Sequence, residues 1–344
     1  MDVITILNTI RANASAQYQS IVPKADRDNM ESIRAVMVSD ENVQVVNEFM
    51  NTLLNKVIRT QVINKMFTNP LKSLKRGKKP LGDTVEEIYT NFLKGEEHDA
   101  TGANLLKRNL PDTKAVYHRM NSKNKFKVTV DNGDIEKAFA SYEALDSYIT
   151  GIINAVYNSS ELAEFLKMKE LMSSAMKNGA MVMIDISDPL ASDANAKSFI
   201  KAVKTESGLM VFPSDAHNAY LTAQDVDDVP ITTFSRKDEQ VLIIDTATDV
   251  SVNVDVLASV FNMSVAEFND TRKIVIDVFP EVTGYKSVHA VLVDEQFFQV
   301  FDDRFVFKAF ENPEGLYTNY ILHDWKTVAY SILVNAVAFG VKSA

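Results

Sequence analysis

Residues 287–341 constrain the fold of this chain more than any other segment. They contain the runs VHAVLV, FFQVFD, RFVFKAF and YTNYILHDW, which are rich in β-branched and aromatic residues and have the length of β-strands. Seven of the 19 phenylalanines lie between Phe297 and Phe339. The tetrapeptide at 312–315, Asn-Pro-Glu-Gly, is typical of a turn. The segment therefore predicts β-sheet at the end of the chain, and it contains no catalytic motif.

Helical periodicity is strongest in residues 135–176, where apolar residues follow one another by three or four positions. Asn158 and Glu161 resemble a capping box within this pattern. Asn178 and Gly179 end it with a C-cap signal. The pattern predicts a helix that is about 60 Å long if continuous, which suits the spine of a scaffold.

The remaining segments mix both periods, so the predicted fold class is α+β. Residues 83–95 predict a short helix, and residues 114–130 predict a basic β-hairpin with a polar turn at 121–124. Such a hairpin carries little apolar surface of its own and needs a surface to lie on. Further predicted elements are strands at 180–186, 241–245 and 273–279 and a helix at 192–206.

Charge is distributed unevenly along the chain, whose net charge is −10. Residues 51–82 hold eight basic and no acidic side chains, and residues 104–130 hold seven basic side chains against Asp112. Residues 185–303 hold 21 acidic and eight basic side chains, a net charge of −13. A chain of this kind can attract its own copies head to tail or hold a polyanion on one side. The alternative interpretation is that the basic and the acidic regions are two solvent-exposed faces that bind no partner.

The length of 344 residues allows two lobes or one core with large excursions. The chain has no cysteine, which excludes disulfides and thiolate chemistry and fits a reducing cytoplasm. The most apolar window, residues 328–341, is shorter than the roughly 20 residues that a membrane-spanning helix needs, so we expect no membrane segment.

Catalytic and metal-binding motifs give no positive signal. The sequence lacks a P-loop, GxGxxG, HExxH and GxSxG, so we expect no catalytic residue, cofactor or metal. The five histidines are scattered, and the acidic residues Asp225, Asp227 and Asp228 fail the EF-hand pattern. Residues 214–217, Ser-Asp-Ala-His, place triad residue types side by side, but triad members normally come from separate elements, so we interpret them as a turn.

Three stretches together resemble major capsid proteins of small tailed bacteriophages, of the podovirus type that infects Gram-positive hosts. They are YNSSELAEFLKMKELM, VLIIDTATDVSVNVDVLASVFN and FENPEGLYTNYILHDWKTVAYSILVNAVAF. The resemblance implies the Hong Kong 97-type capsid fold. Its parts would be an N-terminal arm (1–81), an extended loop (82–131), a peripheral domain with a spine helix (132–186), an axial domain (187–282) and return strands of the peripheral domain (283–344).

The resemblance also implies a function. The chain would self-assemble as pentamers and hexamers into an icosahedral head that encloses double-stranded viral DNA. Scaffolding and portal proteins would be further partners, and the protein would be assembled in the host cytoplasm and reside in the virion. The extended loop would lie on a neighbouring subunit. Its basic residues are the expected intersubunit contacts: Lys114, Arg119, Lys123, Lys125 and Lys127.

Two other functions stay open on the sequence. A bacterial nanocompartment shell has the same fold but packages an enzyme instead of nucleic acid. An unrelated enzyme or nucleic-acid-binding protein would lack this fold, and the missing motifs and the acidic stretch at 185–303 argue against it.

Overall fold

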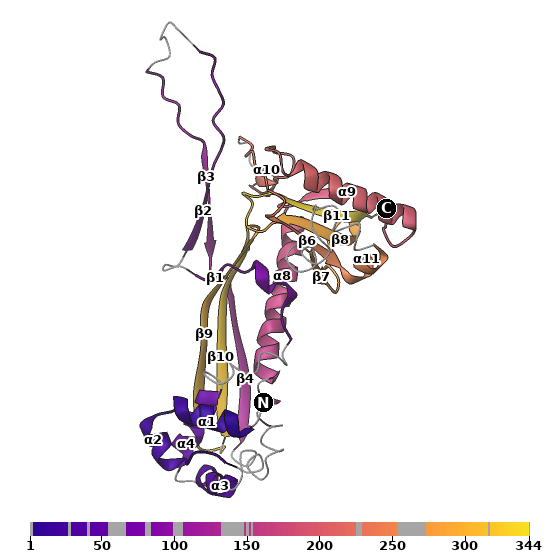
Figure 1. Cartoon of the computed structure of the whole chain (residues 1–344). Helices are drawn as coiled ribbons and strands as arrows, with labels where there is room; N and C mark the ends of the chain where they lie inside the picture. The colour runs from indigo at the N-terminus through magenta and orange to yellow at the C-terminus, as the bar shows by residue number, and fades with distance from the viewer. Residues whose placement is uncertain are drawn as a thin grey trace. The chain divides into compact units, whose positions relative to one another are not determined.

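A computed structural model describes most of the chain and divides it into two compact units (Figure 1). The described residues are 3–26, 29–39, 42–53, 67–79, 84–98, 106–131, 148, 151–152, 154–224, 229–252, 273–315 and 317–343. Unit 1 comprises residues 1–69, 122–164 and 302–326, and unit 2 comprises residues 70–121, 165–301 and 327–344. None of the helices within the described ranges has the length and apolarity needed to cross a bilayer.

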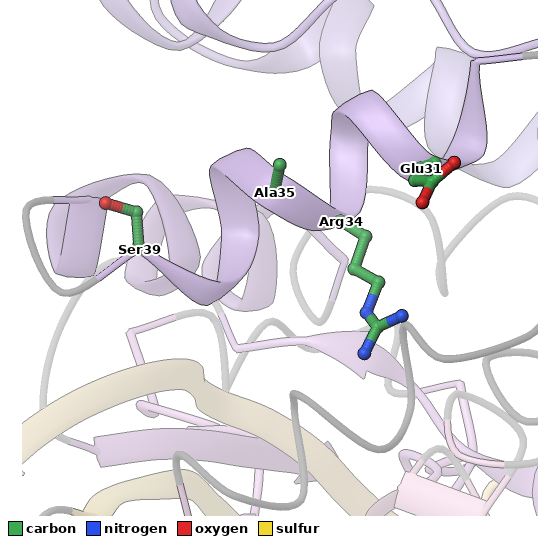
Figure 2. Close-up of a pocket in the computed structure, with 4 residues that line it drawn as sticks. All are labelled: Glu31, Arg34, Ala35 and Ser39. Carbon is green, nitrogen blue, oxygen red and sulfur yellow. The ribbon is translucent and has the colours of Figure 1, made fainter.

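Short helices form the beginning of unit 1. They are α1 (Val3–Asn13), α2 (Ala16–Ile21), α3 (Met30–Val38) and α4 (Val43–Thr52). Ser15 caps α2 by accepting the Tyr18 N–H, and its own hydroxyl donates to Glu48 on α4 at 2.8 Å. A shallow depression of about 340 Å³ lies beside α3, lined by Glu31, Arg34, Ala35 and Ser39 (Figure 2). The helices bury apolar side chains in one cluster that includes Ile10, Phe49 and Leu53.

Long strands complete unit 1. They are β9 (Phe298–Asn312), β10 (Tyr317–Tyr330) and β4 (Ser122–Asp131), and the sheet that they form has the order β1-β9-β10-β4. Its first strand, β1 (Gly77–Lys78), has only two residues. β4 and β10 are antiparallel, with Lys125 opposite His323. The predicted turn at 312–315 is confirmed, because the Asn312 carboxamide oxygen accepts the N–H groups of Glu314 and Gly315. One face of β4 carries Phe126 and Val128 onto the cluster of the N-terminal helices.

The predicted spine helix is confirmed in its second half. A π-helical turn (Asn154–Asn158) leads into α8 (Ser159–Lys177), while residues 132–147 lie outside the described ranges. The predicted capping box is wrong. The side chains of Asn158 and Glu161 instead accept the N–H groups of Phe67 and Asn69, which lie far away in sequence. The predicted end is correct: Gly179 has φ +67°, and the N–H groups of Gly179 and Ala180 bond to the carbonyls of Met176 and Ala175.

A buried ionic network links α8 to β10 within unit 1. The Lys326 ammonium lies 2.8 Å from a Glu164 oxygen and 2.6 Å from an Asp324 oxygen. Ser160 donates to Asp324, and the Asn69 carboxamide donates to Glu164 at 2.9 Å. Burial alone lowers the pKa of Lys326, but the two carboxylates outweigh it and raise the pKa above its ordinary value. The ammonium therefore stays charged where it is buried.

Unit 2 is built around a five-stranded sheet of order β5-β11-β8-β6-β7. Its strands are β5 (Val182–Asp185), β6 (Gln240–Asp245), β7 (Lys273–Ile276), β8 (Tyr285–Asp294) and β11 (Ala336–Lys342). The predicted strands at 180–186, 241–245 and 273–279 are confirmed. The C-terminal run 287–341 thus supplies strands to the two larger of the described sheets, because β9 and β10 belong to the four-stranded one.

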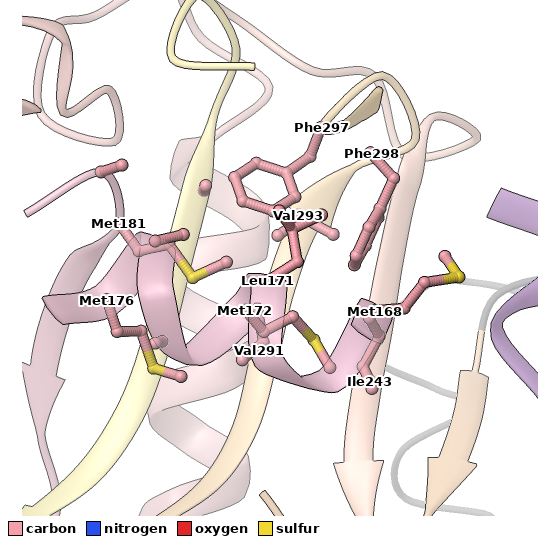
Figure 3. Packing of buried hydrophobic residues seen from close by; sticks show 14 of the residues in the cluster. Met168, Leu171, Met172, Met176, Met181, Ile243, Val291, Val293, Phe297 and Phe298 are labelled. Carbon is pink, nitrogen blue, oxygen red and sulfur yellow. The ribbon is translucent and has the colours of Figure 1, made fainter. Parts of the chain in front are cut away.

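Helices cover both faces of the five-stranded sheet. Alternate residues of β8 point to opposite sides: Val291 and Val293 pack in the cluster of α8, and Leu292 packs in the cluster of α9 (Asp193–Leu209). The first cluster includes four methionines of α8 and the loop after it, together with Phe297 and Phe298 (Figure 3). Ser192 caps α9 as an N-cap, which agrees with the predicted helix at 192–206. The described residues of this unit also form short helical turns: a 3₁₀ turn at Pro70–Leu74, α10 (Tyr220–Gln224) and α11 (Thr246–Ser251).

The structure contradicts two predictions in the basic region. Residues 84–90 form a strand, β2 (Thr84–Thr90), and not a helix. β2 pairs antiparallel with β3 (Thr113–Arg119). Figure 1 shows irregular chain extending from the ends of both strands, and the described residues 84–98 and 106–119 are here called the ribbon. The predicted hairpin at 114–130 is also wrong, because β3 pairs with β2 and β4 pairs with β10. In both cases a strand is specified by a partner remote in sequence, which local periodicity does not contain.

Candidate assembly surfaces

The five basic residues expected at subunit contacts are divided between the two units. Lys114 and Arg119 lie on β3 in unit 2, and Lys123, Lys125 and Lys127 lie on β4 in unit 1. Lys114 is engaged within its own unit: its ammonium is 3.0 Å from Asp112, and its side chain is only 10% exposed. The alternation of β3 places Arg119 on the opposite face, exposed to solvent. Whether any of the five contacts a neighbour stays a prediction.

The three lysines of β4 share one face of the sheet with basic residues that the sequence analysis did not single out. We call this surface the basic sheet face: Lys123, Lys125, Lys127, Arg304 and Lys308. The Trp325 ring shows that Lys123 and Arg304 lie on the same side of the sheet. The Lys123 ammonium is 5.2 Å from the ring centroid and the Arg304 guanidinium is 4.7 Å from it. Strand alternation from Arg304 places Lys308 on the same side of β9. All five side chains are exposed.

The opposite face of the same strands is apolar. The helical cluster of unit 1 packs against Phe126 and Val128 of β4 and against Phe305 and Phe307 of β9. The Tyr157 ring contacts the rings of Phe305 and Phe307. The alternation between apolar and basic residues is thus a sheet pattern with one buried and one solvated face. Residues 114–130 were expected to carry little apolar surface and to need a surface to lie on; β4 supplies Phe126 and Val128 to such a surface, the helical cluster of unit 1.

The ribbon exposes apolar side chains. On its outer face Ile88 and Tyr117 are each 62% exposed. Beyond the paired strands, the exposed fractions are 67% for Leu93, 93% for Leu106 and 79% for Leu110. The inner face is attached to unit 2: Tyr89 packs on the cluster of α8, and Phe92 stacks on Phe234 with ring centroids 6.4 Å apart. A projection with this much apolar exposure is typical of an interaction site.

Three buried histidines in unit 2 each lie against a carboxylate. His118 is 2.6 Å from Glu87, His217 is 2.9 Å from Glu206, and His289 is 3.2 Å from Asp245. Asp245 also caps α11 through Thr248, and although burial acts to raise its pKa, the bonds from His289 and Thr248 lower it overall. These pairs join neighbouring segments, so their geometry favours a structural role.

The tetrapeptide Ser-Asp-Ala-His at 214–217 is a turn, as predicted, anchored by a bridge between Ser214 and Thr233. The other two histidines, His98 and His323, are distant in sequence from the three that pair with carboxylates. Among the residues with described positions, no group of three or more His, Asp or Glu side chains could hold a metal ion. The acidic residues 225–228 lie outside the described ranges.

Comparison with known proteins decides the family. The model of the Phi29-like phage major capsid protein family matches residues 7–340. The chain belongs to this family. The major capsid protein of Bacillus phage PZA is 33% identical to it over 336 residues, which cover 97% of this chain and 72% of that relative. The major capsid protein of Streptococcus phage Cp-1 is 25% identical over 349 residues, with 96% and 92% covered.

The fold of this Phi29-like capsid protein is that of Hong Kong 97-type capsids. It superposes on a chain of the capsid structure of Staphylococcus phage Andhra with a TM-score of 0.66 at 14% identity, covering 82% of this chain and 86% of that one. The predicted α+β class and capsid fold are therefore confirmed. The protein is a phage major capsid protein that forms the head shell. The family match therefore favours the phage capsid over the two alternatives, a nanocompartment shell and an unrelated enzyme.

Proposed function

We propose that this capsid protein assembles as pentamers and hexamers into an icosahedral head that encloses double-stranded DNA. Membership in the Phi29-like family carries the proposal. The protein acts by binding and not by catalysis. Assembly takes place in the host cytoplasm with scaffolding and portal proteins as partners, and the finished protein resides in the virion.

The parts of the chain take the roles that the resemblance implies. Residues 1–81 act as the N-terminal arm, 82–131 as the extended loop, 132–186 as the peripheral domain with the spine helix, 187–282 as the axial domain and 283–344 as return strands. The ribbon supports the role of the extended loop, because a two-stranded projection with exposed leucines gains stability by lying on a second copy.

Apolar and charged contacts contribute differently to assembly. The ribbon leucines bury apolar area on the neighbouring subunit, and Arg119 on the outer face of β3 is placed to meet an acidic neighbour. The acidic stretch at 185–303, with a net charge of −13, is the complementary surface. Each contact is repeated over the shell, so the total free energy of the contacts is large even where a single contact is weak.

Salt should suppress the start of assembly more than it weakens finished shells. The Debye length falls from about 8 Å at physiological ionic strength to about 3 Å at 1 M, so early contacts that depend on charge are screened. Finished shells also contain buried apolar area. We expect 1 M salt added before assembly to reduce particle formation and the same salt added afterwards to leave shells intact, as measured by light scattering. Equal or faster assembly at 1 M salt would show that apolar burial governs the early contacts.

A further inference from the structure

We propose that the basic sheet face of unit 1 (Lys123, Lys125, Lys127, Arg304 and Lys308) binds the phosphate backbone of double-stranded DNA. The inference rests on the proposed function, since it names the surface through which the shell would contact its DNA. It assigns the three lysines of β4 to DNA and leaves the ribbon to the neighbouring subunit.

The spacing of the cations suits a linear polyanion. Alternate residues on a strand are about 6.6–6.8 Å apart, so the three lysines of β4 form a row of roughly 13 Å. Arg304 and Lys308 form a second row on β9, separated from the first by β10. Adjacent strands are about 4.8 Å apart, which puts the rows about 10 Å from each other. Two parallel rows of cations can follow one stretch of DNA backbone.

The charge on this face is of one sign and is not neutralised internally. None of the five basic side chains forms an ion pair with a residue that the structure describes. The acidic residues of these strands lie elsewhere: Asp324 points into the buried network, and strand alternation places Asp131 and Asp302 at the two ends of the face. No acidic side chain of these strands therefore lies between the two rows of cations.

The support behind this face holds the cations in place. The opposite side of the same strands packs into the apolar cluster of unit 1, so the backbone positions are fixed before a ligand arrives. Trp325 lies between Lys123 and Arg304 and orients both side chains through cation–π contacts. Binding then orders fewer side chains than it would on a flexible basic tail.

The composition of the face distinguishes DNA from a neighbouring subunit as the partner. The cores of protein interfaces are depleted in charged residues. Surfaces that bind DNA are instead more polar and strongly positive. Here five cations flank the middle strand β10, and the apolar side chains exposed beside them on β9 are Val306 (39%) and Phe310 (71%). The exposed leucines of the ribbon occur on a separate surface. Because contacts to phosphates carry no sequence information, the predicted binding is independent of DNA sequence.

Titration of the full-length subunit with a short double-stranded DNA tests the proposal. Trp325 is the single tryptophan of the chain, so its fluorescence reports on this face directly. We expect DNA to change the emission and the affinity to fall with salt. The triple variant Lys123→Gln, Lys125→Gln, Lys127→Gln should reduce the slope of log affinity against log salt by about 2.7, and Lys125→Gln alone by about 0.9.

A matched control variant removes the same number of positive charges from a different surface. Lys197, Lys201 and Lys204 are exposed on α9 in unit 2, and their triple change to Gln should leave the DNA salt slope as in the wild type. Thermal unfolding of every variant checks the fold. An unchanged slope in the β4 triple variant, or equal losses in both triple variants, would overturn the proposal.

The alternative occupant is an acidic surface of another subunit, and two measurements separate it from DNA. We expect the β4 triple variant to form particles at the wild-type yield, and poly-L-glutamate to change Trp325 emission less than DNA of equal charge. A variant that binds DNA normally but forms no particles would assign the face to a subunit contact and refute the DNA assignment. Failure of the wild type itself to form shells would instead refute the proposed function. The DNA titration uses the unassembled subunit, so its result does not depend on shell formation.

Discussion

Replacing Lys326 with methionine should reduce the free energy of unfolding by about 3–5 kcal/mol, because removal of one partner leaves buried charge uncompensated. Lys326 is the cation for two carboxylates, Glu164 and Asp324, whose side chains are only 4% and 3% exposed. Without it, the donors that remain include two neutral ones, Ser160 for Asp324 and Asn69 for Glu164. Denaturant unfolding of the wild type and the variant measures the loss.

An exposed lysine provides the control. Lys342 lies 3.5 Å from Asp185, and its side chain is 68% exposed, so Lys342→Met should change stability by at most about 1 kcal/mol. Similar effects of the two changes would mean that the network at Lys326 is not buried as described.

The pH dependence of the Lys326 contribution follows from the raised pKa of its ammonium. The contribution is complete below the pKa of a lysine in the unfolded chain and is lost as pH rises through the higher folded-state value. The difference between wild type and variant should therefore persist at neutral pH.

Changing the exposed ribbon leucines to serine should abolish particle formation while the subunit stays folded. Leu93, Leu106 and Leu110 are 67%, 93% and 79% exposed, so their replacement should change the stability of the isolated subunit little. If each becomes buried on a neighbour, it contributes about 1.5–3 kcal/mol to that contact. Particle yield measured by sedimentation should fall to background in the triple variant.

A second set of exposed apolar residues is the control. Leu190 is 48% exposed and Val250 is 82% exposed, and both lie outside the ribbon. Leu190→Ser combined with Val250→Ser should leave the yield unchanged. Particles at the wild-type yield from the ribbon variant would show that the ribbon does not carry the subunit contact.

The sequence predicted the elements whose signals are local. The Asx turn at Asn312 and the glycine end of α8 at Gly179 are each specified by a few adjacent residues, and both are present. The segment around Val85 and Tyr89 was predicted as a helix, because its apolar spacing fits three and four residues. It forms a strand because β3 supplies its hydrogen-bond partners more than twenty residues later.

The surfaces were only partly predictable for the same reason. The sequence predicted Lys123, Lys125 and Lys127 as contact residues of a basic hairpin, but the row of cations opposite them comes from Arg304 and Lys308 on β9. Only the sheet order β9-β10-β4 brings the two rows to one face. The network of Asn69, Glu164 and Lys326 likewise joins three segments whose local patterns contain no sign of one another.

Electron microscopy of the purified full-length protein, concentrated alone and with the proposed scaffolding protein, tests the central claim that this chain builds a closed shell. We expect uniform icosahedral particles whose capsomers are pentamers and hexamers of this chain. A protein that stays monomeric at every concentration, or that forms only open and irregular aggregates under all of these conditions, would contradict it.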